Sequence, residues 1–349
     1  MSIKSLLKRN RLILLLHRAY QAYKQGYNSA VFYNDNGFSK VYYYIKSGDT
    51  ISGFFAEYRR LIDALAYADH FGFVPYVVYN KEYLYAENER YLGTDNPFEY
   101  YFEQVDPEFD EKTNSFMLFE EKHREYIYRD ILDRNVTTQY AMTDEQQEAY
   151  FVRAIDIIQK YIRFNKRTDE YLKSEIQRKL GDKRTLGVHA RGGEWRTITI
   201  KGHPVAITLE EHIRDTKKVF EENHFEQIFL ATDEKDAIKA FEQEFGSSVV
   251  YFDDVVRGES GEVLAFSSNE RPHHKYLMGL EVLRDAETLV HCSGLIAGLS
   301  NISQYCQMKK RAIGERYDFL LIENNGIHKD GIASFDASHQ PTILKDKNN

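Results

Sequence analysis

The spacing of apolar residues changes along the first part of the chain, and each kind of spacing predicts a different secondary-structure element. The β-branched and aromatic run Val41–Ile45 is typical of a buried strand. From Phe54 to Leu65 apolar residues recur at helical spacing, and Gly72 marks the end of that helix. Because the next run, Phe73–Tyr79, again favours a strand, the region predicts a strand–helix–strand unit with parallel strands.

The second half of the chain repeats this alternation several times. Short apolar runs rich in Val, Ile, Leu and Phe alternate with longer amphipathic stretches, which is the pattern of a doubly wound α/β unit. The expected order is strand Thr185–His189, helix Leu209–Phe220, strand Gln227–Ala231, helix Lys235–Phe245, strand Ser248–Phe252, helix His274–Cys292, strand Leu295–Gly298 and a short helix from Ser300.

The length of 349 residues is more than one hydrophobic core usually serves, so two domains are expected. A long helix is predicted from Phe151, and the charged stretch Phe164–Arg184 after it contains few large apolar residues. We place the domain boundary in that stretch. The expected organisation is a basic helix over residues 1–26, an N-terminal Rossmann-like domain over 27–180, a C-terminal Rossmann-like domain over 181–325 and an irregular tail over 326–349.

The composition narrows the class of protein. With 42% hydrophobic and 29% charged residues, the chain has the composition of a globular protein. A formal charge of −8 argues against a general nucleic-acid binder, which needs a surplus of Lys and Arg. Cys292 and Cys306 are too few for a disulfide framework, so a reducing, cytoplasmic compartment fits best.

The first twenty-five residues differ from this acidic average, because they carry basic side chains and no acidic one. Their apolar run Leu12–Leu16 is too short to span a membrane. Two interpretations stay open: a basic helix that lies on an anionic membrane surface, or an exposed basic helix packed on its own protein. The expected location is therefore cytoplasmic, with peripheral contact to the inner face of the cell membrane as an open alternative.

Candidate chemistry gathers where the predicted strands of the second half end. His189 and Arg191 follow the first of these strands, Asp233 follows the second, and Ser300 and Asn301 open the helix after the last. In open α/β sheets, ligands bind beyond the carboxyl ends of the strands, where helix N-termini also converge. A guanidinium with helix-terminal amides and hydroxyls is suited to a diphosphate. The same residues also fit a structural salt bridge, a core histidine and a helix N-cap.

Motifs in the second half follow one another in a definite order. The segment Gly187–Glu194 resembles the first donor-binding motif of the α1,6-fucosyltransferase and protein O-fucosyltransferase superfamily. Ile228–Glu234 resembles the second motif of that superfamily, and Gly279–Asp285 with Gly298–Asn301 resembles the third. The first motif continues through His203-Pro204 and Leu209–Ile213.

Two segments of the first half, Gly53–Ala56 and Asn96–Glu103, resemble bacterial members related to the rhizobial nodulation fucosyltransferase. The resemblance thus runs from about Gly48 to Asn301. It implies an α/β protein of GT-B architecture, with two facing Rossmann-like domains built on parallel sheets. The second domain would bind the donor GDP-fucose, and the first would take the acceptor. The implied reaction is inverting transfer of fucose to a hydroxyl of a glycan acceptor in bacterial polysaccharide biosynthesis, with no metal or other cofactor.

The resemblance also implies a role for individual residues, all of them in the donor site. His189 and Arg191 would hold the diphosphate, and Ser300 and Asn301 would lie near the phosphates. Asp285 would contact guanine, and Asp233 would lie in the nucleotide crevice. Gly53 and Phe54 would approach the nucleotide from the first domain.

The chain departs from the family pattern directly after Arg191. The bacterial pattern continues Arg-Gly-Thr-Asp, whereas this chain has Gly193 and Glu194 in the last two places. Thr199 stands where the mammalian core fucosyltransferase carries its proposed base. Glu194 is then the nearest acid that could take the acceptor proton, so Arg191 and Glu194 are the catalytic candidates. An exposed loop acid is the alternative for Glu194.

Several alternatives stay open beside this reading. If the site has lost catalytic activity, the protein binds a nucleotide sugar without transferring it. If the site is active, its donor can also be a GDP-sugar other than GDP-fucose. A Rossmann dehydrogenase is disfavoured, because no Gly-x-Gly-x-x-Gly follows a predicted strand. Asp253 and Asp254 can form a metal site or an acidic turn. The aromatic segment Phe98–Phe102 can stack on acceptor sugars or lie in the core.

Overall fold

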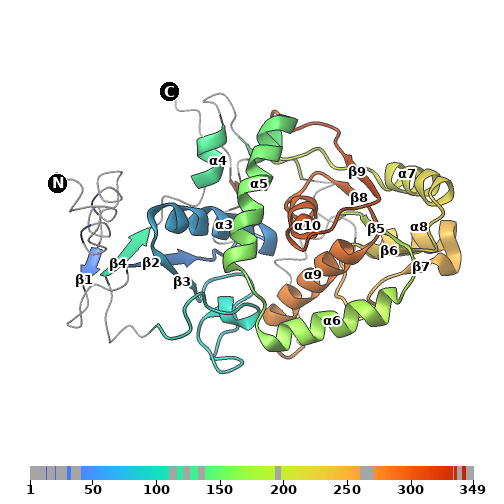
Figure 1. Cartoon of the computed structure of the whole chain (residues 1–349). Coiled ribbons are helices and arrows are strands. Elements are labelled where there is room, and N and C mark those ends of the chain that lie inside the picture. Colours follow the sequence, from blue (N-terminus) through green and yellow to red (C-terminus); the bar gives the residue numbers. More distant parts are fainter. Residues whose placement is uncertain are drawn as a thin grey trace.

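The computed structural model describes residues 30–32, 41–109, 116–120, 126–132, 138–192, 198–259, 271–332, 334–335 and 340–342, together with Ile13 and Tyr20. Two α/β units lie side by side, each built around its own sheet (Figure 1). The basic helix predicted over residues 1–26 falls almost entirely outside the described residues. Among the described residues, no helix is both long enough and apolar enough to cross a bilayer.

The first unit is a four-stranded sheet with helices packed on it. In chain order it contains β1 (Ala30–Phe32), β2 (Val41–Ser47), α3 (Phe54–Phe71), β3 (Val74–Tyr79), β4 (Phe116–Glu120), α4 (Tyr126–Ile131) and α5 (Asp144–Tyr161), with short 3-10 helices at Pro97–Tyr100 and Gln139–Ala141. The strand order is β1-β4-β2-β3, in which β2 is parallel to β3 and β4 and the edge strand β1 is antiparallel to β4. The predicted strand–helix–strand unit is confirmed, and α3 ends at Gly72 in the left-handed conformation.

The second unit is a parallel sheet with helices on both faces. It contains α6 (Lys166–Leu180), β5 (Thr185–His189), α7 (Leu209–Glu222), β6 (Gln227–Ala231), α8 (Lys235–Phe245), β7 (Val249–Val250), α9 (His274–His291), β8 (Gly294–Gly298), α10 (Asn301–Ala312) and β9 (Phe319–Glu323). The strand order β7-β6-β5-β8-β9, parallel throughout, is that of a doubly wound unit. The fold class predicted from the sequence, α/β with parallel sheets in two units, is confirmed.

Some elements differ from the prediction. The charged stretch at the predicted domain boundary forms α6, which packs against α9 of the second unit. Strand β9, at a place where no strand was predicted, is an edge strand, and only its last residue is buried. Residues 326–332, predicted to begin an irregular tail, pair with residues near Ile200 and Pro204. Farther on, β10 (Ser334–Phe335) pairs with β11 (Pro341–Thr342).

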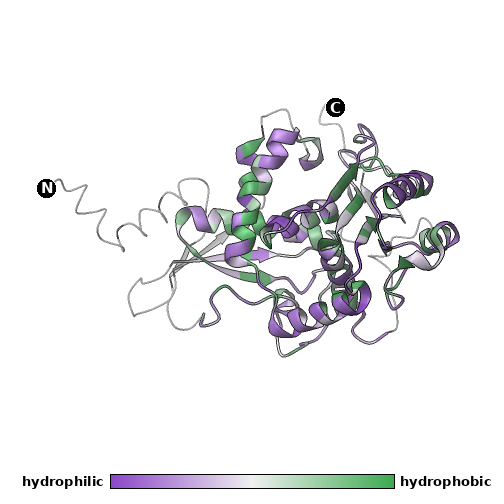
Figure 2. Ribbon diagram, turned by 45° about the vertical axis from the view of Figure 1, so that its right-hand side comes forward, coloured by the Kyte–Doolittle hydropathy of each residue, from purple (hydrophilic) through white to green (hydrophobic). Residues whose placement is uncertain are grey.

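One hydrophobic cluster extends from the first unit into the second. Its contact between the units is aromatic: the ring of Tyr305 on α10 lies 4.4 Å from that of Phe55 and 4.9 Å from that of Tyr58, both on α3. The aromatic side chains of the segment Phe98–Phe102 are buried in the same cluster, so they form core and not a surface for stacking sugars. Figure 2 shows apolar residues along the strands and on the inward faces of the helices, with polar residues outside.

Helix α9 makes a close backbone contact with the first unit. The Tyr101 hydroxyl donates a hydrogen bond of 2.9 Å to the carbonyl of Tyr276, one turn before Gly279. A Cβ added at Gly279 would lie 2.2 Å from the Tyr101 hydroxyl oxygen and 2.8 Å from its Cζ. Glycine is therefore required at this position by the approach of a buried ring, since no side-chain atom fits between them.

We predict that Gly279→Ala destabilises the protein by roughly 1–3 kcal/mol, because the added methyl group forces Tyr101 out of its packed position. Tyr101→Phe removes the oxygen that the methyl group meets, so the double variant should lose less stability than the sum of the two single variants. Urea unfolding of the four proteins measures this coupling. Additive losses would contradict the proposed contact.

Candidate functional site

The carboxyl ends of β5, β6 and β8 meet along one edge of the second sheet, which we call the carboxyl edge. In the strand register His189 at the end of β5 lies beside Ala231 of β6 on one side and Ala297 of β8 on the other. Arg191 and Asp233 follow the first two strands, and α10 begins just after the third. The structure thus brings together the three strand ends that the sequence pattern predicts.

His189 is almost fully buried at this edge, with 6% of its surface exposed. Burial, with the charge of Arg191 and the neighbouring His212, lowers the pKa of His189 to about 3. Its imidazole is therefore neutral at physiological pH. The Nδ1 atom has no hydrogen-bond partner among the described residues. A neutral imidazole can offer an anionic ligand one N–H donor but no charge.

The loop that carries Arg191 is fixed by the residues after β6. The Asp233 carboxylate accepts a hydrogen bond of 2.8 Å from the amide of Gly192. A Cβ at Gly192 would lie 2.3 Å from Glu234 Oε2, so only glycine allows this approach. Asp233 thus holds the chain directly after Arg191 in place. Glu194, the candidate base, lies outside the described residues, as does Gly193.

Arg191 lies among groups from three separate parts of the chain. Burial, followed by the charges of Arg191 and His328, lowers the pKa of His203 to about 4. Burial raises the pKa of Tyr140, and the guanidinium groups of Arg191 and Arg59 act against this rise. The ring centroids of Tyr140 and His203 are 5.7 Å apart. Tyr140 of the first unit therefore lies beside His203, and the charge of Arg191 acts on both side chains, which favours the binding of an anion there.

The start of α10 joins the two units beside this group. The Ser300 hydroxyl accepts a hydrogen bond of 3.1 Å from the amide of Ser303 and so acts as the helix N-cap. Ser300 is thus a helix N-cap, the predicted alternative to a role in phosphate binding. Asn301 Oδ1 accepts a hydrogen bond of 2.8 Å from Gln139 Nε2 of the first unit. This bond places the 3-10 helix Gln139–Ala141 against the N-terminus of α10.

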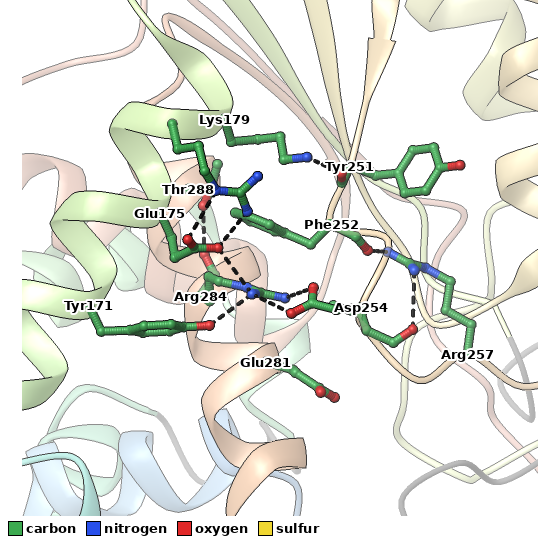
Figure 3. Close-up of polar contacts among 12 residues, drawn as sticks. Tyr171, Glu175, Lys179, Tyr251, Phe252, Asp254, Arg257, Glu281, Arg284 and Thr288 are labelled. Atoms are coloured by element: carbon green, nitrogen blue, oxygen red, sulfur yellow. Dashed lines mark hydrogen bonds and ion pairs between the residues drawn. The ribbon is translucent and has the colours of Figure 1, made fainter.

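Asp285 lies on α9, with 9% of its surface exposed. Burial raises its pKa to about 7, although the charges of Arg257 and Arg284 work in the opposite direction. Its Oδ1 has no hydrogen-bond partner among the described residues. Arg257 is held near it by hydrogen bonds to the carbonyl of Thr232 (3.1 Å) and to that of Phe252 (2.8 Å), the second of which is drawn in Figure 3. A buried carboxylate with a free acceptor atom is therefore set beside a fixed guanidinium near the end of β6.

The neighbouring Arg284 is a buried side chain at the centre of a polar network that reaches the surface at Asp254 (Figure 3). Its guanidinium donates to both carboxylate oxygens of Asp254, at 2.5 and 3.0 Å, and to the Tyr171 hydroxyl at 2.8 Å. Glu175 lies 3.3 Å away, and the ring of Phe252 covers one face at 3.9 Å. Asp254 is thus committed to a salt bridge. Within the described ranges, no group of three or more His, Cys, Asp or Glu side chains is arranged to hold a metal ion.

The first-unit candidates Gly53 and Phe54 stand at the start of α3. The Phe54 ring is buried and lies 5.2 Å from Tyr101 and 5.7 Å from Tyr85. Its amide donates a hydrogen bond of 3.3 Å to the Tyr85 hydroxyl. Gly53 is exposed, with no atom within 4 Å of a Cβ built on it. The structure therefore places the Phe54 side chain in the core and leaves the Gly53 backbone at the surface.

Sequence reasoning missed the part of the site that comes from other segments. Gln139 and Tyr140 follow no strand and carry no motif, so nothing in the local pattern marks them. His203 belongs to the first motif but was given no role, and Arg59 looks like one of several charged residues on α3. Spatial convergence on Arg191 identifies them, and that convergence depends on how the units pack.

No family model matches the chain, and no curated protein matches its sequence. Solved structures do match. NodZ alpha-1,6-fucosyltransferase soaked with GDP-fucose is 14% identical, with 77% of this chain and 92% of that chain covered and a TM-score of 0.46. Fucosyltransferase NodZ from Bradyrhizobium is 13% identical, with coverage of 77% and 92% and a TM-score of 0.45.

POFUT1 in complex with GDP is a third match of this kind, with 10% identity, coverage of 82% of this chain and 99% of that chain, and a TM-score of 0.47. Identities and TM-scores of this size describe a distant likeness. The assignment of the fold rests on the strand order of the chain itself, which defines a protein of two α/β units with a doubly wound second unit.

We predict that the stability change in Asp285→Asn depends on pH. Below the ordinary carboxyl pKa of 3.8, Asp285 is protonated in the folded and unfolded chain. Above its folded pKa of about 7 it is ionised in both, and the cost of burying the charge is then fully present. Wild type should therefore lose stability relative to the Asn variant as pH rises through this window, by an amount on the order of a few kcal/mol.

Urea unfolding of both proteins at about pH 5 and about pH 8 measures this difference. Asp253→Asn is the matched control, because that exposed acid lies near the same loop and has no such burial cost. A stability difference that stays constant with pH would contradict the assignment for Asp285.

Proposed function

We propose that the protein is an inverting glycosyltransferase that moves fucose from GDP-fucose to a hydroxyl of a glycan acceptor. The observation that carries the proposal is the position of Arg191 at the carboxyl edge, where His189, Asp233 and the N-terminus of α10 also lie. A diphosphate needs fixed cationic donors of this kind, since it carries charge before, during and after the reaction. The ordered motifs of the sequence support the same ligand and add the guanine base and the sugar.

The chemistry requires a nucleophile, a leaving group and a proton acceptor. The acceptor hydroxyl oxygen attacks the anomeric carbon, the bond from that carbon to the β-phosphate oxygen breaks, and its electron pair remains on GDP. Arg191 stabilises the negative charge that grows on the leaving diphosphate, together with the first amides of α10. Glu194 takes the proton of the acceptor hydroxyl. The protein donors replace a metal ion in this scheme, so activity is expected to survive chelation.

Asp285 is the proposed reader of guanine. An ionised carboxylate can accept hydrogen bonds from the ring N–H and the exocyclic amine of guanine, and uracil does not offer this pair of donors. The free Oδ1 of Asp285 and its burial support this role, because an unpaired buried carboxylate gains most from a donor. Arg257 favours the ionised form that guanine needs.

Two other functions use the same site. A nucleotide-sugar-binding protein without turnover would keep Arg191 and Asp285 but lack an effective base, and the altered pair Gly193 and Glu194 motivates this alternative. A transferase for another GDP-sugar would differ only in contacts to the sugar. Donor hydrolysis and transfer assays separate the first case, and calorimetric titration with GDP-fucose, GDP-mannose and UDP-sugars separates the second. Membrane contact through residues 1–26 stays a prediction.

We predict that GDP raises the unfolding temperature and that UDP does not, because ligand binding to the folded state shifts the transition by mass action. Arg191→Ala should abolish most of the GDP shift, since it removes a bidentate donor to the diphosphate. Arg191→Lys should restore little, because a point charge cannot reproduce the planar guanidinium. Thermal unfolding with each nucleotide tests this. Equal shifts with GDP and UDP would rule out the guanine assignment.

We predict that Glu194→Gln keeps donor affinity and lowers turnover by roughly a hundredfold or more, because the amide keeps the shape of the acid but cannot accept a proton. Calorimetry with GDP and a transfer assay with the same preparation give both quantities. Glu210→Gln, on the exposed surface of α7, is the control. Wild-type turnover in Glu194→Gln would place the base elsewhere.

A further inference from the structure

The chain returns to the carboxyl edge after β9. Residues 326–332, which we call the return segment, run alongside residues 199–205. Five backbone hydrogen bonds join the two: Val205 N to Gly326 O (2.9 Å), His328 N to His203 O (2.9 Å), Gly202 N to His328 O (2.9 Å), Lys201 N to Ile332 O (3.0 Å) and Ile332 N to Thr199 O (3.0 Å).

Gly331 allows this close pairing. Its φ of 125° is a conformation that other residues rarely adopt. A Cβ at this position would lie 2.3 Å from the carbonyl oxygen of Thr199, which is backbone and cannot rotate away. The return segment therefore depends on a glycine at the point of nearest approach.

The pairing sets His328 beside His203. The His328 amide donates a hydrogen bond to the carbonyl of His203, and the His328 carbonyl accepts one from the amide of Gly202. The charge of His328 acts on His203, as does that of Arg191. From the other side, Thr138 Cβ lies 3.8 Å from a Cβ built at Gly202. The loop of residues 199–205 is thus held between the return segment and the turn that carries Tyr140.

His328 is half-buried and pairs through its backbone with His203, on whose pKa both His328 and Arg191 act. An imidazole N–H can donate to a phosphate oxygen and, when protonated, adds charge to the same contact. The return segment therefore adds a donor to a site whose other donors come from the strand ends and from α3.

We propose that His328 binds the diphosphate of the donor together with Arg191, and that the return segment holds His328 and His203 in position for this. The inference rests on the proposed function, because it assigns a further contact to the same ligand. It makes the C-terminal part of the chain a component of the binding site.

The test measures the binding of inorganic pyrophosphate and of GDP to the full chain by calorimetry. His328→Phe keeps a ring of similar size without a donor, and His328→Gln keeps an N–H donor without the ring. If His328 donates to the diphosphate, the Phe variant should lose roughly tenfold or more in affinity for both ligands, and the Gln variant should lose clearly less. Lys329→Ala, at the exposed neighbouring residue, should bind as wild type does.

Gly331→Ala should weaken both ligands as well, by moving the return segment away from Thr199. Gly314→Ala is its control, because Gly314 also has a positive φ, 83°, but no atom lies within 4 Å of a Cβ there. Wild-type affinity in His328→Phe, or an equal loss in the Phe and Gln variants, would overturn the role of His328 as a donor. Pyrophosphate carries no base, so its affinity for the variants tests the role of His328 alone. The proposed function is contradicted by a different result, equal binding of GDP and UDP to the wild type.

Discussion

The Arg284 guanidinium is a buried charge on which much of the second unit is arranged. A charge at this depth needs partners, and the Nε of Arg284 has none among the described residues, so loss of a partner at its other nitrogens would be costly. Its partners come from α6 and from the loop after β7, with Tyr171 and Asp254 as the shortest contacts. The next residue on α9 is Asp285, and the loop that carries Asp254 also carries Arg257. Asp285, which is proposed to read guanine, and Arg257, which favours its ionised form, are therefore positioned by an ion pair that need not touch the ligand.

The fold could be predicted from the sequence where side-chain burial follows a strong local period. Strands β5 and β6 and helix α8 have the bounds that the pattern indicates, because their apolar runs are buried on all sides or along one wide face. Helix α6 was hidden by its charge: only one residue in each turn, such as Leu172 and Ile176, faces the protein. Strand β9 was not predicted although its sequence, Phe319-Leu-Leu-Ile-Glu323, is mostly apolar; at the sheet edge only Glu323 is buried. The return segment has no periodic signal, since backbone hydrogen bonds and not side chains hold it.

The candidate site shows the same division. Residues placed by strand topology, such as His189, Arg191 and Asp233, could be predicted, because parallel strands end at one edge whatever their loops do. Their individual roles could not, because a role depends on partners elsewhere in the chain: Asp233 fixes a loop, and the Ser300 hydroxyl caps a helix. The groups that gather around Tyr140 come together only through the packing of the two units. No local pattern contains that information.

The aromatic contact of Tyr305 with Phe55 and Tyr58 has a thermodynamic consequence. Units that share one apolar interior cannot open independently without exposing it to water, so the architecture has two parts while its unfolding is expected to be one cooperative event. A ligand that binds at the carboxyl edge of the second sheet is then expected to stabilise α3 and the first sheet against unfolding as well. Conformational freedom left for substrate entry would reside in loops, not in a hinge between the halves.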